Sequence, residues 1–462
     1  MKKEHVAIIV ITVAVILGLL IGFNDNFFIQ EEVNSDELLT SGDFISGDSL
    51  SGDLSGEVIE NISGDFAEIP DDNFSEVIPP ESTDDNILSG ETSSNESNDT
   101  PPVTIVQTDK KIPENIKAIY ATGWVMGTKS IREDVVATLK ENGYNAIVID
   151  IKDEAGQLSY MSSVQTAKDI GASVKMISNP FEIVQQLKDE GFYVIGRIVT
   201  FKDPIYASKV SSIAYKKSDG SIWKDYNGNC WPNPYNKESW NYPIEIAKEA
   251  AEIGFQEIQF DYIRFPSSEG KTSTIAYGFD RATKSKSDMI NGFLEKAMKE
   301  LEPYNIVVSA DVFGITTKRD GDFENIGQDF SKIASIVDVI CPMVYPSHYA
   351  NNEYKVSRPD KEPYKIVTES MLDAFERYDS YVNAHSGDNK EIKLAKFRPY
   401  IQDFTASWLG KGNYIVYGNK EVATQIQALY DLEIYDFCLW DPNNKYCYTA
   451  IKDAVIKKDT NN

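Results

Sequence analysis

The sequence predicts an α/β protein whose folded part is a (β/α)8 TIM barrel, and three observations lead to this prediction. From about Ile112 onward, a unit of helical stretch, glycine and short β-branched run recurs along the chain. Eight such runs alternate with helical stretches, whereas a doubly wound sheet more often has about five to seven strands. The long connections follow the strands rather than the helices, as is typical of a barrel elaborated on one face.

The recurring unit indicates where helices end and strands begin. Gly143, Gly191 and Gly254 each follow a helical stretch, so each glycine is expected at a helix C-cap. The run after each glycine is apolar on both faces, as a buried strand of a parallel sheet is. The predicted strands are Lys117 to Val125, Asn145 to Lys152, Tyr193 to Phe201, Glu257 to Phe265, Ile306 to Gly314, Val337 to Tyr345, Phe397 to Phe404 and Tyr435 to Asp441. The predicted helices include Ile131 to Asn142, Pro180 to Glu190, Trp240 to Ile253, Ser285 to Leu301, Tyr364 to Tyr381 and Lys420 to Tyr430.

The connections differ in length on the two sides of the predicted strands. Those from helix to strand are mostly about two to five residues long, whereas those from strand to helix include residues 154–179, 202–239 and 266–284. In a barrel the strand-to-helix loops meet at the C-terminal ends of the strands, where active sites are built. We therefore expect the functional site at that end.

The N-terminal residues 1–23 predict a cytoplasmic stub and a transmembrane anchor. Val6 to Phe23 is a run of 18 mostly apolar residues, long enough to span a bilayer. Lys2 and Lys3 precede the run, which predicts a single-pass protein with its N-terminus in the cytoplasm and its C-terminal domain extracellular. A cleaved signal peptide is the alternative, although Gly22 to Asn24 lacks the usual small-residue cleavage pattern.

Residues 24–111 predict a disordered acidic linker. Asn24 to Asp109 holds 22 acidic residues and no lysine or arginine, and it repeats a Ser-Gly-Asp theme. Repelling carboxylates and flexible glycine and serine favour an extended tether over a calcium-binding repeat, because the spacing is irregular. The barrel is then assigned to residues 112–462. Most of the net charge of −27 lies in the linker, and no basic block predicts a nucleic-acid partner.

Charged side chains stand near the C-terminal ends of five predicted strands, although barrel strands should be apolar. By the two-residue period of a strand, Asp261 and Asp311 should both point into the barrel mouth. They lie on sequential strands, which are about 4.8 Å apart when neighbours. The other polar groups at these ends are Asp150, Lys152, Asp153, Arg197, Arg264, Gln402 and Asp403.

Two facing carboxylates, one ionised and one protonated, suit the cleavage of a glycosidic bond. We therefore predict Asp261 as the nucleophile or base and Asp311 as the acid. The structural alternatives are that Asp261 is fixed in a buried ion pair by Arg264 or Arg197, and that Asp311 caps a turn. Aromatic residues at strand ends could stack on sugar rings or belong to the core; those expected to bind sugar are Trp124, Tyr345 and Trp440.

The chain resembles the bacterial putative glycosyl hydrolase domain family, which is grouped with the TIM-barrel glycosidases. The resemblance rests on the segments "AIYATGWVMG", "AIVIDIKDEAGQLSY", "IQFDYIRFP", "VSADVFG", "CPMVYPSHY" and "RPYIQDF", from about Ala118 to Tyr448. It implies a barrel that acts on carbohydrate. Related glycosidases commonly place a nucleophilic aspartate at the end of strand four, which matches Asp261. Many use a glutamate as the acid where this chain has Asp311, so Asp150 and Asp153 remain substitutes.

The leading hypothesis is a membrane-anchored extracytoplasmic glycoside hydrolase that acts on a cell-surface or environmental polysaccharide. Lys152, Asp153, Arg197, Arg264, His348 and Gln402 are expected to bind sugar hydroxyls or to tune the carboxylates. Only three histidines occur, too few for a His-rich metal centre, so no metal and no cofactor are predicted. "GWVMGTKS" fails the spacing of a phosphate loop, so no nucleotide is expected. The rival hypothesis is a non-catalytic, carbohydrate-binding barrel of the cell envelope.

Overall fold

The computed structural model describes residues 104–267, 275–318, 325–387 and 391–456. The predicted anchor and nearly all of the predicted linker lie outside these ranges. Across the described ranges, no helix combines the length and the apolar character that crossing a membrane requires.

The predicted barrel is confirmed. Eight parallel strand positions close on themselves, because each strand pairs with its neighbours in chain order and the last pairs with the first. Two short segments, β11 (Lys396–Phe397) and β12 (Tyr400–Gln402), follow one another beside β9 at the seventh position. The other strands are β2 (Lys117–Ala121), β3 (Ala146–Lys152), β4 (Tyr193–Val199), β6 (Glu257–Asp261), β8 (Val307–Phe313), β9 (Val339–Met343) and β13 (Phe437–Trp440).

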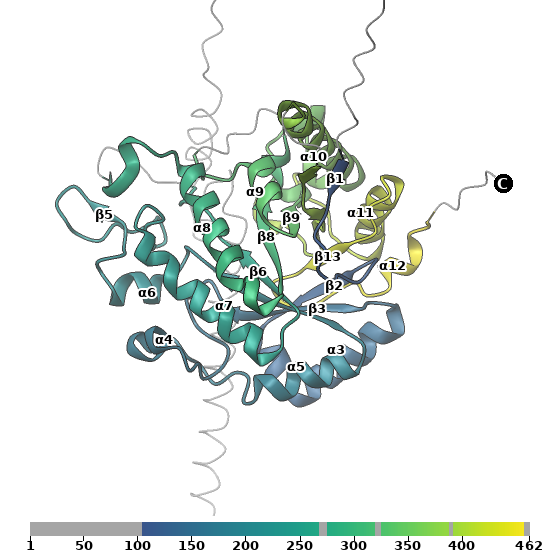
Figure 1. Cartoon of the computed structure of the whole chain (residues 1–462). Coiled ribbons are helices and arrows are strands. Elements are labelled where there is room, and N and C mark those ends of the chain that lie inside the picture. Colours follow the sequence, from purple (N-terminus) through teal and green to yellow (C-terminus); the bar gives the residue numbers. More distant parts are fainter. Residues whose placement is uncertain (1–103, 268–274, 319–324, 388–390, 457–462) are drawn as a thin grey trace, which may run out of the picture.

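Helices surround the strands on the outside (Figure 1). Gly143 and Gly254 adopt left-handed φ values of 80° and 109° at helix C-caps, as predicted. The short helix α9 was not predicted. The surrounding helices are α3 (Lys129–Asn142), α5 (Pro180–Asp189), α7 (Asn241–Ile253), α8 (Lys286–Leu301), α9 (Phe330–Ile336), α10 (Pro363–His385), α11 (Asn419–Asp431) and α12 (Ala450–Asp453).

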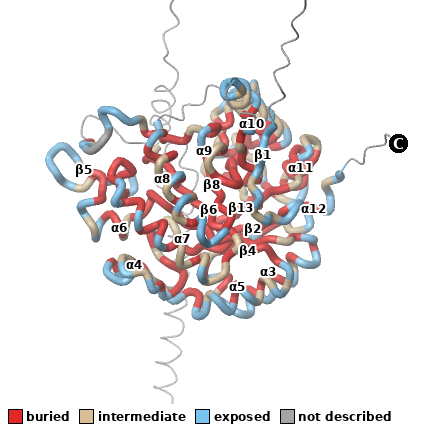
Figure 2. Tube along the Cα trace, in the orientation of Figure 1, coloured by how far each residue is buried: buried red, intermediate tan, exposed pale blue. Residues whose placement is uncertain are grey.

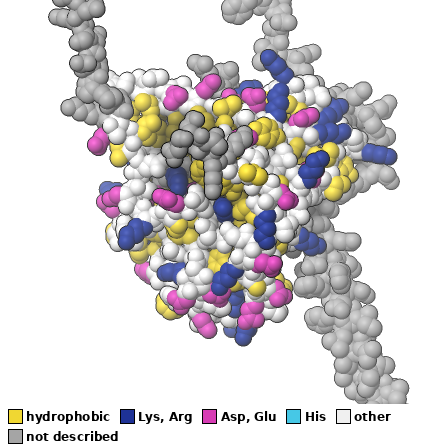
Figure 3. All heavy atoms as spheres, turned by 90° about the vertical axis from the view of Figure 1, so that its right-hand side faces the viewer, with side chains coloured by type: hydrophobic (Ala, Val, Ile, Leu, Met, Phe, Trp, Pro, Cys, Tyr) yellow, Lys and Arg dark blue, Asp and Glu magenta, His cyan; other side chains and the backbone are white. Residues whose placement is uncertain are grey.

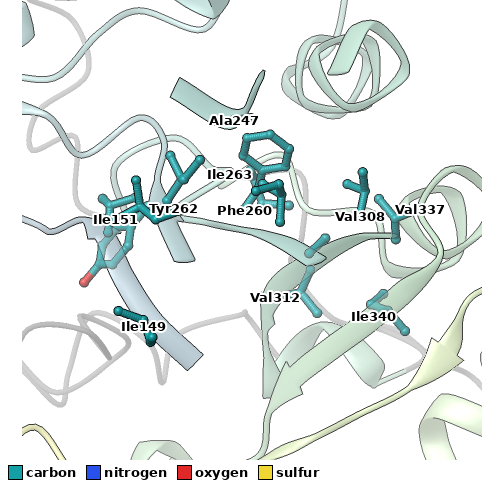
Figure 4. Close-up of a cluster of buried hydrophobic side chains, with 14 of the residues drawn as sticks. Ile149, Ile151, Ala247, Phe260, Tyr262, Ile263, Val308, Val312, Val337 and Ile340 are labelled. Atoms are coloured by element: carbon teal, nitrogen blue, oxygen red, sulfur yellow. The ribbon is translucent and has the colours of Figure 1, made fainter. Parts of the chain in front are cut away.

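The largest apolar core lies between the strands and the helices. Buried residues follow the strands, while exposed residues gather on the outer helices and loops (Figure 2). Ile149, Phe260, Val308 and Ile340 are outward-facing strand residues of this core (Figure 4). The outer surface in Figure 3 carries charges of both signs, interspersed. This layering leaves the inward-facing strand positions to a second set of side chains.

The barrel interior holds a fully buried ion pair. Arg398 Nη1 donates to Glu257 Oε1 at 2.6 Å, and neither side chain is exposed. The Arg398 guanidinium also lies 6.0 Å from the centre of the Tyr193 ring. Glu257 begins β6, so this pair lies nearer the N-terminal ends of the strands than the predicted site does.

The described residues 104–111, which precede the predicted barrel boundary at Ile112, contact the barrel. The strand β1 (Thr104–Val106) pairs in parallel with β10 (Glu391–Lys393). Lys110 Nζ then donates to the Ile306 carbonyl and to Asp338, both at 2.8 Å. Residues 104–111 are therefore part of the folded unit rather than of the linker.

The ends and loops of the strands correct several smaller expectations. The first strand ends at Ala121, because the Thr122 hydroxyl caps the helix α2 (Gly123–Gly127). Trp124 therefore lies on a helix rather than at a strand end, and it is 59% exposed. The long loops carry further elements: α4 (Gln165–Ile170), α6 (Pro204–Lys209) and the antiparallel pair β5 (Lys216–Lys217) and β7 (Ile275–Ala276).

We expect Arg398→Met to lower the free energy of unfolding by about 3 to 5 kcal/mol, because it leaves Glu257 charged and unpaired in the interior. Urea unfolding measures this change. The double variant Glu257→Leu/Arg398→Met should lose less of the free energy of unfolding than Arg398→Met does, since neither charged side chain remains. Arg358→Ala, at an exposed arginine, is the control and should stay within about 0.5 kcal/mol of the parent. Equal stability of the parent and Arg398→Met would contradict this prediction.

Candidate active site

Arg197 joins three carboxylates at the C-terminal ends of the strands. Its Nε and Nη2 both donate to Asp261 Oδ2, at 2.9 and 2.6 Å. Nη1 donates to Asp150 Oδ1 at 2.6 Å, and Nη2 also reaches Glu154 Oε1 at 2.5 Å. The Arg197 side chain is fully buried. The ion pair of Asp261 with Arg197, one of the two structural alternatives, is therefore present.

Asp261 is held through its second oxygen as well. Its Oδ1 accepts the backbone N–H of Tyr262 at 2.5 Å. Tyr262 has a φ of 49°, a left-handed conformation that is rare for a bulky residue. Such backbone strain is concentrated at functional sites. The turn after β6 thus fixes the orientation of the Asp261 carboxylate.

Asp311 is the neighbour of Asp261 on β8. Phe260 pairs with Ala310, so Asp261 and Asp311 follow at the same level of neighbouring strands. Asp311 is 1% exposed, and its Oδ1 has no hydrogen-bond partner in the described structure. Burial, and then the charge of Asp261, raise the pKa of Asp311 well above its usual value. The surroundings of Asp311 therefore favour the protonated form of its carboxyl group.

Asp150 in β3 and Glu154 in the loop after it have pKa values shifted in opposite directions. Burial raises the pKa of Asp150 to about 6, although Arg197 acts against this shift and Tyr120 donates to its Oδ2 at 2.5 Å. Burial is the largest influence on Glu154 and acts to raise its pKa, but the charge and hydrogen bond of Arg197 together with the charge of Lys202 outweigh it, so the net shift is downward. Asp153, beside them, has its pKa raised to about 8 by burial and by the charge of Glu154. Arg197 thus opposes the effect of burial on the pKa values of Asp150 and Glu154, whereas in the described part of the chain it forms no ion pair with Asp153.

Two predicted ligands of sugar hydroxyls are engaged inside the protein. Lys152 Nζ lies 2.7 Å from Asp203 Oδ2, and both side chains are fully buried. Gln402 Nε2 donates to Asp360 and to the Phe404 carbonyl. These contacts occupy both polar heads in the interior, so of the two roles expected for Lys152 and Gln402 they favour contact with protein groups over contact with sugar hydroxyls.

Arg264 lies apart from the Arg197 cluster, among aromatic rings. Its guanidinium stands 4.7 Å from the Phe313 ring centre, 4.8 Å from that of Tyr262 and 5.2 Å from that of Trp231. It is 1% exposed. Arg264 thereby packs against the strained residue that follows Asp261, which indicates a positioning role rather than direct sugar contact.

Aromatic rings line the barrel interior beside Arg197. Tyr120 and Trp440 stack with ring centres 4.1 Å apart, and the guanidinium lies 5.4 and 5.0 Å from their respective centres. Trp440 is only 4% exposed, so its ring packs against Arg197 and has little exposed surface on which a sugar could stack. This buried position departs from the stacking role expected for Trp440.

A second aromatic group, here called the aromatic wall, consists of Tyr345, His348, Phe404 and Trp408. Tyr345 packs edge-on to Phe404 and His348, at 5.7 and 5.3 Å between ring centres. Phe404 stacks on Trp408 at 5.7 Å and 23°. His348, Phe404 and Trp408 are only half-buried. Burial, and then the charges of Asp311 and Asp261, raise the Tyr345 pKa, which places this end of the wall within electrostatic reach of the carboxylates.

Sequence reasoning missed Glu154, Tyr120, Phe404 and Trp408. Glu154 directly follows the charged end of β3, so its position beside Asp153 was an available signal. Phe404 ends the predicted seventh strand, and Trp408 lies four residues further on. Nothing in the spacing alone brings Tyr345 and Trp408 into one wall, since it forms between the loops after two different strands.

Several solved structures are similar to this chain. A hypothetical protein from Ruminiclostridium thermocellum ATCC 27405 is 41% identical over 42% of this chain and 97% of its own, with a TM-score of 0.39. The glycoside hydrolase domain of PgaB (BpsB) from Bordetella bronchiseptica is 11% identical over 78% of this chain and 100% of its own, with a TM-score of 0.50. The spore cortex-lytic enzyme SleL of Bacillus megaterium QM B1551 is 11% identical over 76% of this chain and 75% of its own, with a TM-score of 0.41. No curated protein matches the sequence.

The PgaB likeness concerns the fold alone, which is the TIM barrel of glycoside hydrolases. The family model matches residues 118–446, which include the Arg197 cluster and the eight barrel strand positions except for Lys117, the first residue of β2. Together they support a carbohydrate-active barrel. The chain belongs to the family described as "Putative glycosyl hydrolase domain".

Proposed function

We propose that the barrel is a glycoside hydrolase in which Asp261 and Asp311 form the acid and base pair. The observation that carries the proposal is the contrast between two neighbouring carboxylates. Asp261 is ion-paired with Arg197, whereas Asp311 is buried, has no hydrogen-bond partner at Oδ1 in the described structure, and has its pKa raised by burial and by the charge of Asp261. Pairs of acids whose surroundings separate their pKa values are the usual mark of an acid and base assignment.

In the proposed reaction, Asp311 donates its proton to the departing glycosidic oxygen. Asp261 acts on the anomeric carbon, either directly as a nucleophile or through a water molecule as a base. Arg197 orients the Asp261 carboxylate through two hydrogen bonds, and Asp150 shares the same guanidinium. The aromatic wall supplies apolar ring faces beside the acids, which suits a polysaccharide substrate.

A second candidate function is the non-catalytic binding barrel. It is favoured by one observation: both oxygens of Asp261 already accept hydrogen bonds, from Arg197 and from the Tyr262 N–H. A barrel of that kind would bind glycans through the aromatic wall and would use the buried carboxylates only to hold Arg197. Turnover measurements separate the two functions.

We also propose that the barrel is held outside the cell by the N-terminal segment. Support comes from the apolar run Val6 to Phe23, the preceding Lys2 and Lys3, and the acidic stretch that follows. An extended tether would let the barrel reach cell-surface or environmental polysaccharide.

Asp261→Asn and Asp311→Asn should each lower glycan turnover by about two orders of magnitude or more, because each removes one partner of acid and base catalysis. Reducing-end release from chitin, xylan, β-glucan, galactomannan and peptidoglycan measures the turnover. Asp134→Asn, at an exposed aspartate on α3, is the matched control and should retain full activity. Circular dichroism checks the fold. Unchanged cleavage by either site variant would remove that residue from the pair.

Arg197→Lys should preserve the positive charge but lose the forked contacts, because an ammonium group cannot bridge three carboxylates in the same geometry. We expect turnover to fall by about 100-fold, the scale of a misplaced reacting group. Substrate binding should change less than turnover, since Arg197 acts through Asp261. Steady-state kinetics separate these two effects. A rise in KM with an unchanged kcat would instead assign Arg197 to direct sugar binding.

A protease added to intact cells, after removal of any wall, should cut the acidic linker and release a soluble barrel, because the linker and the barrel are expected outside. Immunoblotting of cells and medium measures the release. Complete protection would indicate the opposite orientation. Full-length protein in the medium without protease would indicate a secreted form without an anchor.

A further inference from the structure

A chain of hydrogen bonds runs behind the aromatic wall, from the buried Asp360 to the His348 ring. Gln402 Nε2 donates to Asp360 Oδ1 and to the Phe404 carbonyl, both at 3.0 Å. Gln402 Oε1 accepts the Ser347 N–H at 3.0 Å and lies 2.8 Å from Ser347 Oγ. Ser347 Oγ in turn lies 2.9 Å from His348 Nδ1.

The donors and acceptors in this chain fix where the protons lie. A backbone N–H can only donate and a carbonyl can only accept, so the amide oxygen of Gln402 must face Ser347 and its nitrogen must face Phe404. The Ser347 hydroxyl then gives its single proton to Gln402 Oε1, because two bare oxygens at 2.8 Å would repel each other. The Ser347 oxygen is left to accept a proton from His348 Nδ1.

A His348 ring protonated on Nδ1 presents Nε2 as a hydrogen-bond acceptor when it is neutral. Burial lowers the pKa of His348 to about 4, so the ring is neutral at pH 7. Within the described part of the chain, Nε2 has no hydrogen-bond partner, and the residue is only half-buried. The hydrogen bond at Nδ1 therefore holds the ring in place, while Nε2 remains available to accept a hydrogen bond from a ligand.

The rings around His348 supply the rest of a binding surface. His348 packs edge-on to Phe404 and to Trp408, with centre distances of 6.2 and 6.3 Å. Phe404 and Trp408 are stacked and half-buried, so they offer a stiff apolar face. The aromatic wall has no ionised side chain at neutral pH, which favours an uncharged ligand.

We propose that His348, Phe404 and Trp408 form a subsite for one neutral pyranose ring of the substrate. Nε2 of His348 accepts a hydrogen bond from a sugar hydroxyl, and the stacked rings cover the C–H face of the sugar. The substrate class rests on the proposed function, whereas the tautomer of His348 does not. Asp360, Gln402 and Ser347 are positioning residues, because they act only through the histidine ring.

The first test is the nitrogen spectrum of the full-length protein labelled with 15N-histidine, at pH 7. The His348 signals are assigned by their loss in His348→Phe. We expect a neutral ring protonated on Nδ1, and we expect Ser347→Ala to move the population toward protonation on Nε2. A parent ring protonated on Nε2, or on both nitrogens, would overturn the proposed acceptor.

The second test is calorimetric titration of full-length Asp311→Asn with chitohexaose, cellohexaose and mannohexaose, so that hydrolysis does not interfere. At least one should bind, and adding Trp408→Ala or His348→Phe should weaken it about tenfold or more, or about 1.4 kcal/mol. His348→Gln, which can return an acceptor oxygen, should recover part of the loss. Adding Tyr226→Ala, at a 68% exposed aromatic outside the wall, should change nothing.

No binding to any of the three oligosaccharides, or equal binding by the Trp408→Ala and His348→Phe proteins, would overturn the subsite. Tighter binding of hexagalacturonate than of the neutral oligosaccharides would overturn its preference for an uncharged ring. Failure of the proposed hydrolysis gives a different result, because the wild-type protein would then bind these oligosaccharides through the subsite without releasing reducing ends.

Discussion

The arrangement of the site depends on one buried guanidinium. Burying a charge is costly unless it is paired and hydrogen-bonded, and Arg197 meets this requirement with Asp150, Glu154 and Asp261. These partners come from β3, from the loop after it and from β6, on either side of β4. The same contacts therefore join neighbouring strands of the barrel and fix the orientation of Asp261.

The electrostatic environment of Asp311 depends on this arrangement. Asp311 is beside Asp261, and burial and the charge of Asp261 together raise its pKa. The proposed proton donor and the ion-paired carboxylate thus lie at the same level of neighbouring strands. The aromatic wall adds a neutral hydrogen-bond acceptor, the His348 ring. Hydrogen bonds that run from Asp360 to His348 hold this ring among apolar rings.

Most of the fold could be predicted from the sequence, because the glycine C-caps and the apolar runs repeat with each unit. The short helix α9 was missed since its seven residues leave little helical periodicity to detect. Asp261 and Asp311 could be placed in the mouth from the two-residue period of the strands. Lys152 could not, because the pairing of β3 with β4 shifts register between Asp150 and Lys152. The aromatic wall depends on how two loops meet, which no local pattern records.

The proposed catalysis requires that one member of the Asp261 and Asp311 pair carries a proton at neutral pH and that the other does not. Neutron diffraction from crystals of the deuterated barrel at pH 7 tests this most directly, because it locates deuterium on individual oxygens. The account predicts deuterium on a carboxyl oxygen of Asp311 and none on Asp261, with the Arg197 guanidinium fully deuterated. Deuterium on Asp261, or a bare Asp311 carboxylate, would contradict it.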